Sequence, residues 1–193
     1  MILCDKEIRE AISGGEIVIF PTPELTQYGP SSLDLMLGEE VKQLKTVSEL
    51  SQQEPRGVQR PVDVDLANVE IRDLVTRYSK DITKREDGSF ILEPQKFILG
   101  VTRERIELPR ESKIAARVEG RSTLARLGLV VHFTAPTIHA SFRGHIVLEM
   151  CNFGPYNLVL APGKLYICQL VFERVGKVPD ADLKSASQDQ THA

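Results

Sequence analysis

The densest group of side chains that could do chemistry lies in the run GRSTLARLG. Two hydroxyls, Ser122 and Thr123, stand between two guanidinium groups, Arg121 and Arg126. Ser122 is expected to begin a short helix over residues 122–127, and free N–H groups at a helix start favour phosphate oxygens. Ser122 and Arg126 are four apart, so they can share one helix face. A capped surface helix with solvated arginines explains the same spacing, and both interpretations stay open.

A glutamate inside an apolar strand is the second candidate. In HIVLEMCN, the side chains of Ile146, Leu148 and Met150 alternate with others that include Glu149. A carboxylate at such a position is costly unless it is paired, hydrogen-bonded or functional. An edge strand with Glu149 in water explains the pattern too, and composition alone favours that second interpretation.

Two known kinds of site are excluded by their motifs. The residues HAS at 139–141 begin like the H-x-E of zinc-dependent deaminases, but Ser141 stands where the proton-shuttling glutamate belongs. No P-C-x-x-C follows, so a zinc site is not expected and no metal ligands are assigned. No G-x-x-x-x-G-K-[ST] occurs either, which excludes a P-loop.

Composition limits the class of protein. The chain has 193 residues, of which 41% are hydrophobic and 26% charged, as expected for a soluble globular protein. Its net charge of -3 argues against a generic nucleic-acid binder. No apolar run reaches the roughly 18 residues of a membrane span, and the N-terminus does not resemble a signal peptide. Three widely spaced cysteines favour reduced thiols and the cytoplasm.

The elements that must position these residues are mostly strands. A strand is predicted over 33–37 and an amphipathic helix over 69–82. In the second half, β-rich segments alternate with Pro and Gly turns at 90–92, 97–101, 114–118, 129–134, 145–151, 157–160 and 165–172. Without alternating helices, this order favours an antiparallel sandwich or barrel. We expect one domain over residues 1–175 and a polar, mobile tail over 176–193.

Longer stretches of the chain resemble a known family. VEGRSTLARLGLVVHFTAPTI followed by FRGHIVLEMCNFGP resembles the core of the dCTP deaminase branch of the dUTPase-like superfamily. The segments MILCDKEIREAI, PSSLDLMLG and PGKLYICQLVF are similar to that family as well. The match is close over residues 113–172, moderate over 1–38 and loose over 39–110. A joint match of this length is far more specific than any short motif.

The resemblance implies a fold, an assembly and an activity. The fold would be mainly β, a dUTPase-like distorted β-barrel or jelly roll with a few short helices. Three copies would form a homotrimer with active sites between subunits. The family hydrolyses dCTP to dUTP and ammonia without zinc, and some members also release pyrophosphate to give dUMP. Magnesium would arrive with the triphosphate. The partner would thus be a deoxycytidine nucleotide, with no nucleic acid polymer and no membrane.

Roles in catalysis carry over residue by residue. Glu149 would be the general base that takes a proton from the attacking water. Ser122 and the backbone near Ala135 would hold that water and the pyrimidine. Arg126 would support the catalytic geometry.

Roles in substrate binding carry over too, with two departures from the family pattern. Arg121 and Thr123 would hold phosphate oxygens. Where most members have I-D-P-G, with the aspartate facing the 3′-hydroxyl of the sugar, this chain has IHAS, so His139 would meet that hydroxyl without a negative charge. Members close the site with a K-Y-x-x-Q-like segment, of which Gln190 is the nearest counterpart here.

Two other functions remain open. In a dUTP diphosphatase the water would attack the α-phosphorus, and Glu149 would bind or reject a base edge. A catalytically silent nucleotide-binding module would explain the missing aspartate and the loosely matching tail. The intact set of Ser122, Arg126 and Glu149 favours deamination over a silent module.

Overall fold

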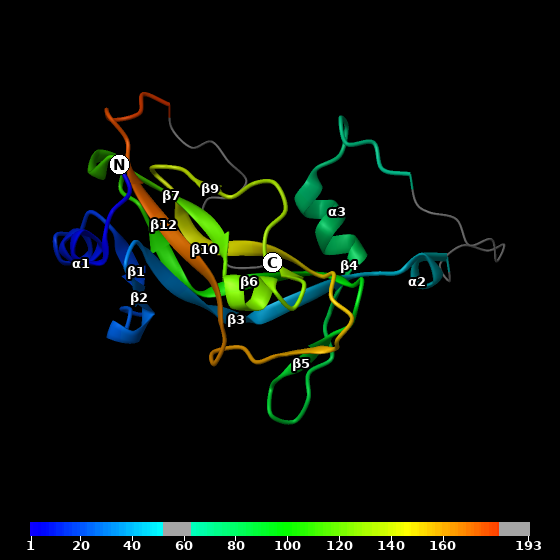
Figure 1. Ribbon diagram of the computed structural model, residues 1–193. Helices are drawn as coiled ribbons and strands as arrows, with labels where there is room; N and C mark the ends of the chain where they lie inside the picture. The colour runs from blue at the N-terminus through cyan, green and yellow to red at the C-terminus, as the bar shows by residue number, and fades with distance from the viewer. Residues whose placement is uncertain (52–62, 182–193) are drawn as a thin grey trace.

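Strands make up most of the regular structure. The computed structural model describes residues 1–51 and 63–181 of the chain. Within these ranges one sheet of ten strands curls around a hydrophobic core, and two further strands form a small sheet (Figure 1). All pairings are antiparallel. The predicted mainly β class with a curled, barrel-like sheet and few helices is therefore confirmed.

The large sheet brings distant parts of the chain side by side. Its path runs β8-β10-β6-β3-β12-β7-β9. These strands are β3 (Ser32–Leu44), β6 (Phe97–Glu107), β7 (Ile114–Gly120), β8 (Leu129–Val130), β9 (Thr137–Ile138), β10 (Arg143–Asn152) and β12 (Tyr166–Arg174). Outside this path, β1 (Val18–Phe20) pairs with β6, and β2 (Tyr28–Gly29) and β4 (Ser79–Asp81) pair with β3. The small sheet joins β5 (Phe90–Leu92) to β11 (Leu158–Leu160).

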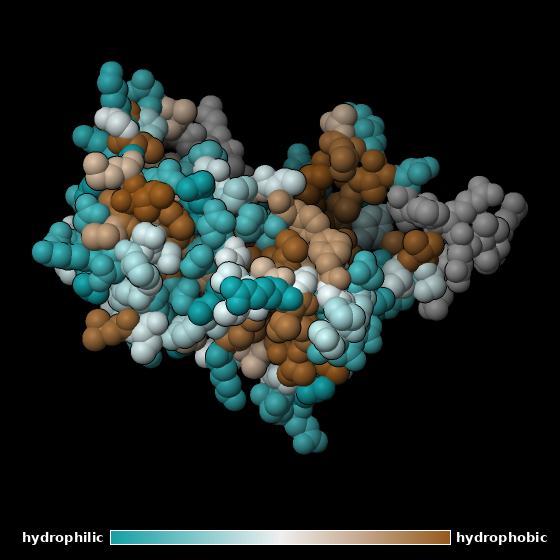
Figure 2. Space-filling view, viewed as in Figure 1, coloured by the Kyte–Doolittle hydropathy of each residue, from teal (hydrophilic) through white to brown (hydrophobic). Residues whose placement is uncertain are grey.

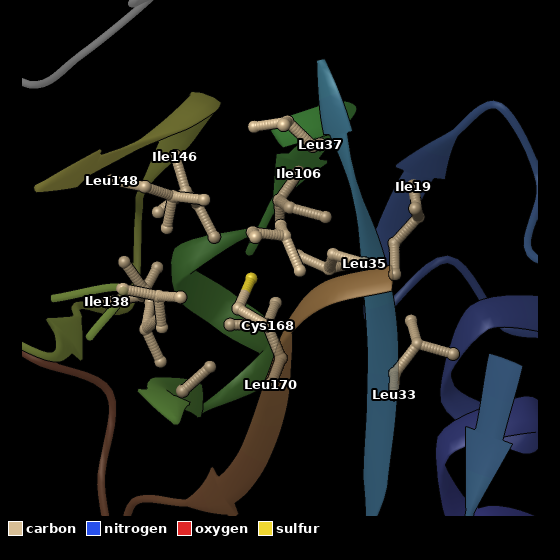
Figure 3. Close-up of a cluster of buried hydrophobic side chains, with 14 of the residues drawn as sticks. Ile19, Leu33, Leu35, Leu37, Ile106, Ile138, Ile146, Leu148, Cys168 and Leu170 are labelled. Carbon is tan, nitrogen blue, oxygen red and sulfur yellow. The ribbon is translucent and has the colours of Figure 1, made fainter. Parts of the chain in front are cut away.

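The core lies inside the curl of the large sheet. Its aliphatic side chains come from alternate positions of the long strands, and burying them is the main favourable contribution to folding. Figure 3 labels ten members: Ile19, Leu33, Leu35, Leu37, Ile106, Ile138, Ile146, Leu148, Cys168 and Leu170. Leu33, Leu35 and Leu37 are fully buried, which confirms the strand predicted over 33–37.

Strand β3 continues well beyond that prediction, to Leu44. Its alternation breaks at Gly38, and its register with β6 shifts between Leu37 and Val41. A Cβ on Gly38 would lie 2.9 Å from the carbonyl oxygen of Val101, so the two backbones approach more closely than a larger residue allows. Because such a bulge changes which side chains face inward, the sequence after residue 38 loses its period of two.

The helices are few and lie around the sheet. They are α1 (Asp5–Ser13), α2 (Val47–Ser51), α3 (Ile71–Tyr78) and α4 (Ser122–Ala125), with 3₁₀ turns at Leu25–Gln27 and Arg110–Ser112. Among the helices in the described ranges, α1 alone contributes buried apolar residues, Ile8 and Ala11. None of the helices in the described parts of the chain has the length and apolar character that a membrane crossing requires.

Helix α3 is shorter than the helix predicted over 69–82. It ends at Tyr78 because Ser79 enters the ladder between β4 and β3, opposite Leu44. The helical spacing of apolar residues is real, yet none of them is buried. Hydrophobic side chains accordingly gather at the surface over α3 (Figure 2).

The three cysteines are free thiols in different environments. Cys4 is exposed, whereas Cys151 on β10 and Cys168 on β12 are buried. Burial raises the pKa of the Cys151 thiol. Burial also raises the pKa of the Cys168 thiol, with a smaller contribution from the carboxylates of Glu104 and Asp34.

Candidate active site

The run GRSTLARLG forms one turn of helix between two strands. The helix predicted over 122–127 extends only over Ser122–Ala125, and its N-cap is Arg121 rather than Ser122. The chain turns at Gly128, where φ is +90° and a Cβ would lie 2.2 Å from the backbone nitrogen of Gly154. A glycine is required at that crossing. It ends the helix early and directs the chain into β8.

The hydroxyls of this run and its second arginine lie at the surface. Ser122, Thr123 and Arg126 are exposed. Their side chains form no hydrogen bond or ion pair with another residue in the described ranges. A helix of four residues has little macrodipole, so any anion here would depend on the side chains and a few N–H groups.

Arg121 is the member of the run that the fold holds most firmly. Its Nη1 lies 2.6 Å from Oδ2 of Asp34, and its guanidinium lies 5.4 Å from the ring centroid of Tyr166. The three residues meet because β12 runs between β3 and β7 (Figure 1). Burial raises the pKa of the Asp34 carboxyl, and the charge of Arg121 opposes that shift only in part.

Gln27 and Glu104 form a buried hydrogen-bonded pair, and Gln27 also contacts the backbone of Asp34. Glu104 is only 1% exposed. Its two oxygens accept hydrogen bonds from Nε2 of Gln27 at 3.1 Å and from the backbone N–H of Met36 at 2.9 Å. The same Gln27 amide donates to the carbonyl oxygen of Asp34 at 2.8 Å. Burial raises the pKa of the Glu104 carboxyl above its ordinary value. The hydrogen bonds from Met36 and Gln27 oppose this shift only in part.

Glu149 lies on β10, opposite Leu99 of β6. Ile146, Leu148 and Met150 are buried on the core side, as the alternation predicted, and Glu149 is half-buried on the other. The neighbouring strand β8 pairs only with Cys151 and Asn152, so within the described ranges no strand lies beside Glu149 on that side. Its carboxylate has no ion pair or hydrogen bond with another described residue. The open side of β10 agrees with the edge-strand interpretation of the sequence, whereas that interpretation put Glu149 in water and the structure has it half-buried.

The other predicted residues lie on loops. Ala135 is exposed between β8 and β9, in a loop held by a 2.8 Å hydrogen bond from the N–H of Val118 to the oxygen of Pro136. His139 is exposed directly after β9. Gln190 and the polar tail from residue 182 onward fall outside the described residues. Among described residues, no hydrogen bond or ion pair joins Ser122, Arg126, His139 or Glu149 to one another.

Four residues that the sequence analysis did not single out either contact Arg121 or belong to the hydrogen-bond network around Asp34. They are Asp34, Tyr166, Gln27 and Glu104. Asp34 could have been found by the argument that found Glu149, because it is also an acid in an alternating apolar strand. Glu104 lies in the charged stretch TRERIE, which conceals a buried carboxylate. The described residues contain no group of three or more His, Cys, Asp and Glu side chains suited to hold a metal.

A model of the family described as dCTP deaminase-like matches residues 2–175 of the chain. The chain belongs to the dCTP deaminase-like family. A relative from Methanosphaera stadtmanae, "dCTP deaminase, dUMP-forming", is 38% identical over 172 residues, which cover 89% of this chain and 78% of that protein. A "dCTP deaminase" from Rhodospirillum rubrum is 37% identical over 176 residues, covering 90% and 82%. The family resemblance found in the sequence is thereby confirmed.

A solved structure of a dCTP deaminase shares the fold of this family member. The crystal structure of 2′-deoxycytidine 5′-triphosphate deaminase from Agrobacterium tumefaciens matches with a TM-score of 0.61 at 21% sequence identity. The match covers 90% of this chain but 48% of the other, so this chain spans about half the length of that protein. At this identity the likeness concerns the fold.

Proposed function

We propose that this protein hydrolyses dCTP to dUTP and ammonia in pyrimidine deoxynucleotide metabolism. The observation that carries the proposal is the family match over residues 2–175, which includes GRSTLARLG and Glu149. Water adds to C4 of cytosine and the C4–N bond breaks, so the enzyme would be a hydrolase acting on a cyclic amidine. Relatives named "dUMP-forming" favour release of pyrophosphate as a further step.

Glu149 is the general base in this proposal. Attack at C4 requires that a proton leave the water and reach N3 and then the departing amine. Glu149 is half-buried and has no ion pair with a described residue, which leaves its carboxylate able to accept that proton. Ser122 and the backbone near Ala135 hold the water and the pyrimidine, and Arg126 supports the catalytic geometry.

The nucleotide's phosphates and sugar have their own residues in the proposal. Arg121 and Thr123 bind phosphate oxygens through N–H and O–H donors. His139 donates or accepts a hydrogen bond at the 3′-hydroxyl. Gln190 is assigned to the closing segment on the family resemblance alone and stays a prediction.

Magnesium enters with the triphosphate. Mg²⁺ usually keeps several waters and binds phosphates with one or two carboxylates. The carboxylate nearest to Arg121 is Asp34, which is already paired with that arginine. The residues present therefore fit a metal held by phosphate oxygens and water, and such a metal would neutralise phosphate charge. Zinc has no part in the proposal, because Ser141 occupies the place of the required glutamate.

We place the active sites between copies of the chain in a homotrimer. The exposed side chains of Ser122 and Arg126 and the half-buried side chain of Glu149 lack partners among the described residues, as groups completed by another subunit would. Phe133 and Phe153 are 46% and 54% exposed. Their ring centroids lie 6.3 Å apart, which makes an exposed aromatic pair suited to a protein interface. The cytoplasm is the proposed location, and no polymer or membrane partner is proposed.

Incubation with dCTP, with and without magnesium, tests the function. dUTP and CTP are incubated in parallel, and products are separated by chromatography. We expect dUTP or dUMP from dCTP, unaffected by a zinc chelator that spares magnesium. If dCTP stays intact while dUTP is cleaved, the protein is a dUTP diphosphatase. If neither reacts but either binds, it is a silent nucleotide-binding module.

A further inference from the structure

Arg121 is held on two sides by residues to which no role has been assigned so far. Asp34 contacts its Nη1 at 2.6 Å, and the ring of Tyr166 lies 5.4 Å from the guanidinium carbon. The side chains of Arg121 and Asp34 are 28% and 18% exposed, so the ion pair is largely sheltered from water. A sheltered pair with an aromatic ring against the guanidinium confines the arginine to one orientation.

Both partners are themselves anchored. The carbonyl oxygen of Asp34 accepts a hydrogen bond from Gln27, which also donates to the buried Glu104. The phenolic oxygen of Tyr166 lies 3.1 Å from the hydroxyl of Thr26. These contacts tie the β3 backbone at Asp34 and the ring of Tyr166 to the 3₁₀ turn before β2, which restricts how far either partner can move with Arg121.

The geometry leaves the arginine able to bind an anion. A guanidinium has five N–H donors, and the bond to Asp34 uses Nη1. The remaining donors can meet phosphate oxygens in a fixed direction, without the entropic cost of ordering a free side chain.

We propose that Asp34 and Tyr166 are positioning residues that fix the guanidinium of Arg121 for the phosphates of the nucleotide. The inference rests on the proposed function, in which Arg121 binds those phosphates. The contrary possibility is a competing role, in which Asp34 neutralises Arg121 and weakens nucleotide binding. The two roles predict opposite changes in KM when the carboxylate is removed.

Steady-state kinetics with dCTP on the full chain distinguish them. In Asp34→Asn we expect KM to rise about tenfold while kcat changes by less than about threefold. The reason is that the phosphates are bound equally strongly in the ground state and in the transition state. In an Arg121→Gln background, Asp34→Asn should change KM no further, since Asp34 acts through Arg121. A structural defect alone would not vanish in that background.

The matched control is Ser32→Ala. It removes a side-chain hydrogen bond to Gln169 that also links β3 to β12 but does not touch Arg121. Its KM should equal that of the wild type. The tyrosine gives an independent test if Asp34→Asn does not fold: Tyr166→Leu should raise KM, whereas Tyr166→Phe keeps the ring, loses only the contact with Thr26 and should raise KM less.

If the wild type is active and KM is unchanged or lower in Asp34→Asn, the inference is wrong and the proposed function stands. The same holds if Tyr166→Leu behaves like the wild type, or if the Asp34→Asn effect persists in Arg121→Gln. If the wild type neither converts nor binds dCTP, the proposed function fails, and the inference fails with it.

Discussion

At the scale of the residue, a substitution of Glu149 tests the proposed chemistry most directly. The substitution Glu149→Gln keeps the size of the side chain and removes its basicity. We expect nucleotide binding to persist and the deamination rate to fall at least about 100-fold, the usual contribution of a general base. Product chromatography measures turnover, and calorimetry with dCTP measures binding. Glu111→Gln, at an exposed position in a 3₁₀ turn, is the control; unchanged turnover in Glu149→Gln would remove this assignment.

The buried carboxyl of Glu104 predicts a pH-dependent stability. Burial raises its pKa in the folded protein above the ordinary value of 4.5, so the folded state keeps the proton to higher pH than the unfolded chain. Its contribution to the free energy of unfolding therefore falls as pH rises from about 4.5 through the raised value. Glu104→Gln should destabilise the protein most near pH 4.5 and less at pH 7.

Thermal melting of the wild type and Glu104→Gln from about pH 4.5 to about pH 7, extended down to about pH 2 for the control below, measures that difference. Glu49→Gln supplies a control of opposite sign. Hydrogen bonds from Lys80 and Thr46 lower the pKa of Glu49 to about 2, so its contribution is present above about 4.5 and is lost as pH falls toward 2. If the loss of stability caused by Glu104→Gln grows with rising pH, the pKa of Glu104 is not raised in the folded protein.

At the scale of the element, the turn at Gly128 decides where α4 ends and β8 begins. In Gly128→Ala the new Cβ meets the Gly154 backbone, and the left-handed φ adds strain. We expect a loss of at least about 2 kcal/mol in the free energy of unfolding, measured by urea denaturation. Gly88→Ala is the matched control, because Gly88 has a φ of +79° but no atom within 4 Å of its Cβ. Equal losses in both variants would show that the close contact costs nothing.

The same element shows how far sequence reasoning reaches. The faces of β10 followed from the alternation of Ile146, Leu148 and Met150, because a period of two depends only on neighbouring residues. The early end of α4 did not follow, because it depends on a backbone crossing with Gly154. The pairing of Asp34 with Arg121 joins residues 87 positions apart, and only the strand order brings them together. Local patterns therefore predicted most of the strands, although the strand expected over 129–134 ends at Val130, but they did not predict which residues pair across the fold.

At the scale of the whole molecule, the proposed homotrimer predicts a particle of three times the 21.6 kDa mass of one chain. Light scattering measures it directly. Phe153→Ser, which removes one ring of the exposed aromatic pair, should shift the protein toward smaller species and lower turnover together, while Glu149 stays intact. Phe20→Ser is the control at a separate exposed aromatic. A monomeric wild type with full activity would contradict sites shared between subunits.

Because the three thiols differ in burial, their alkylation can report local unfolding of the folded chain. Because the thiolate is the reactive form, an alkylating reagent should modify Cys4 readily and leave Cys151 and Cys168 protected by burial and raised pKa. Mass spectrometry would count one added group per chain in the native protein and three after unfolding. The slow appearance of the second and third groups then times the local opening of β10 and β12, the strands that carry Glu149 and Tyr166.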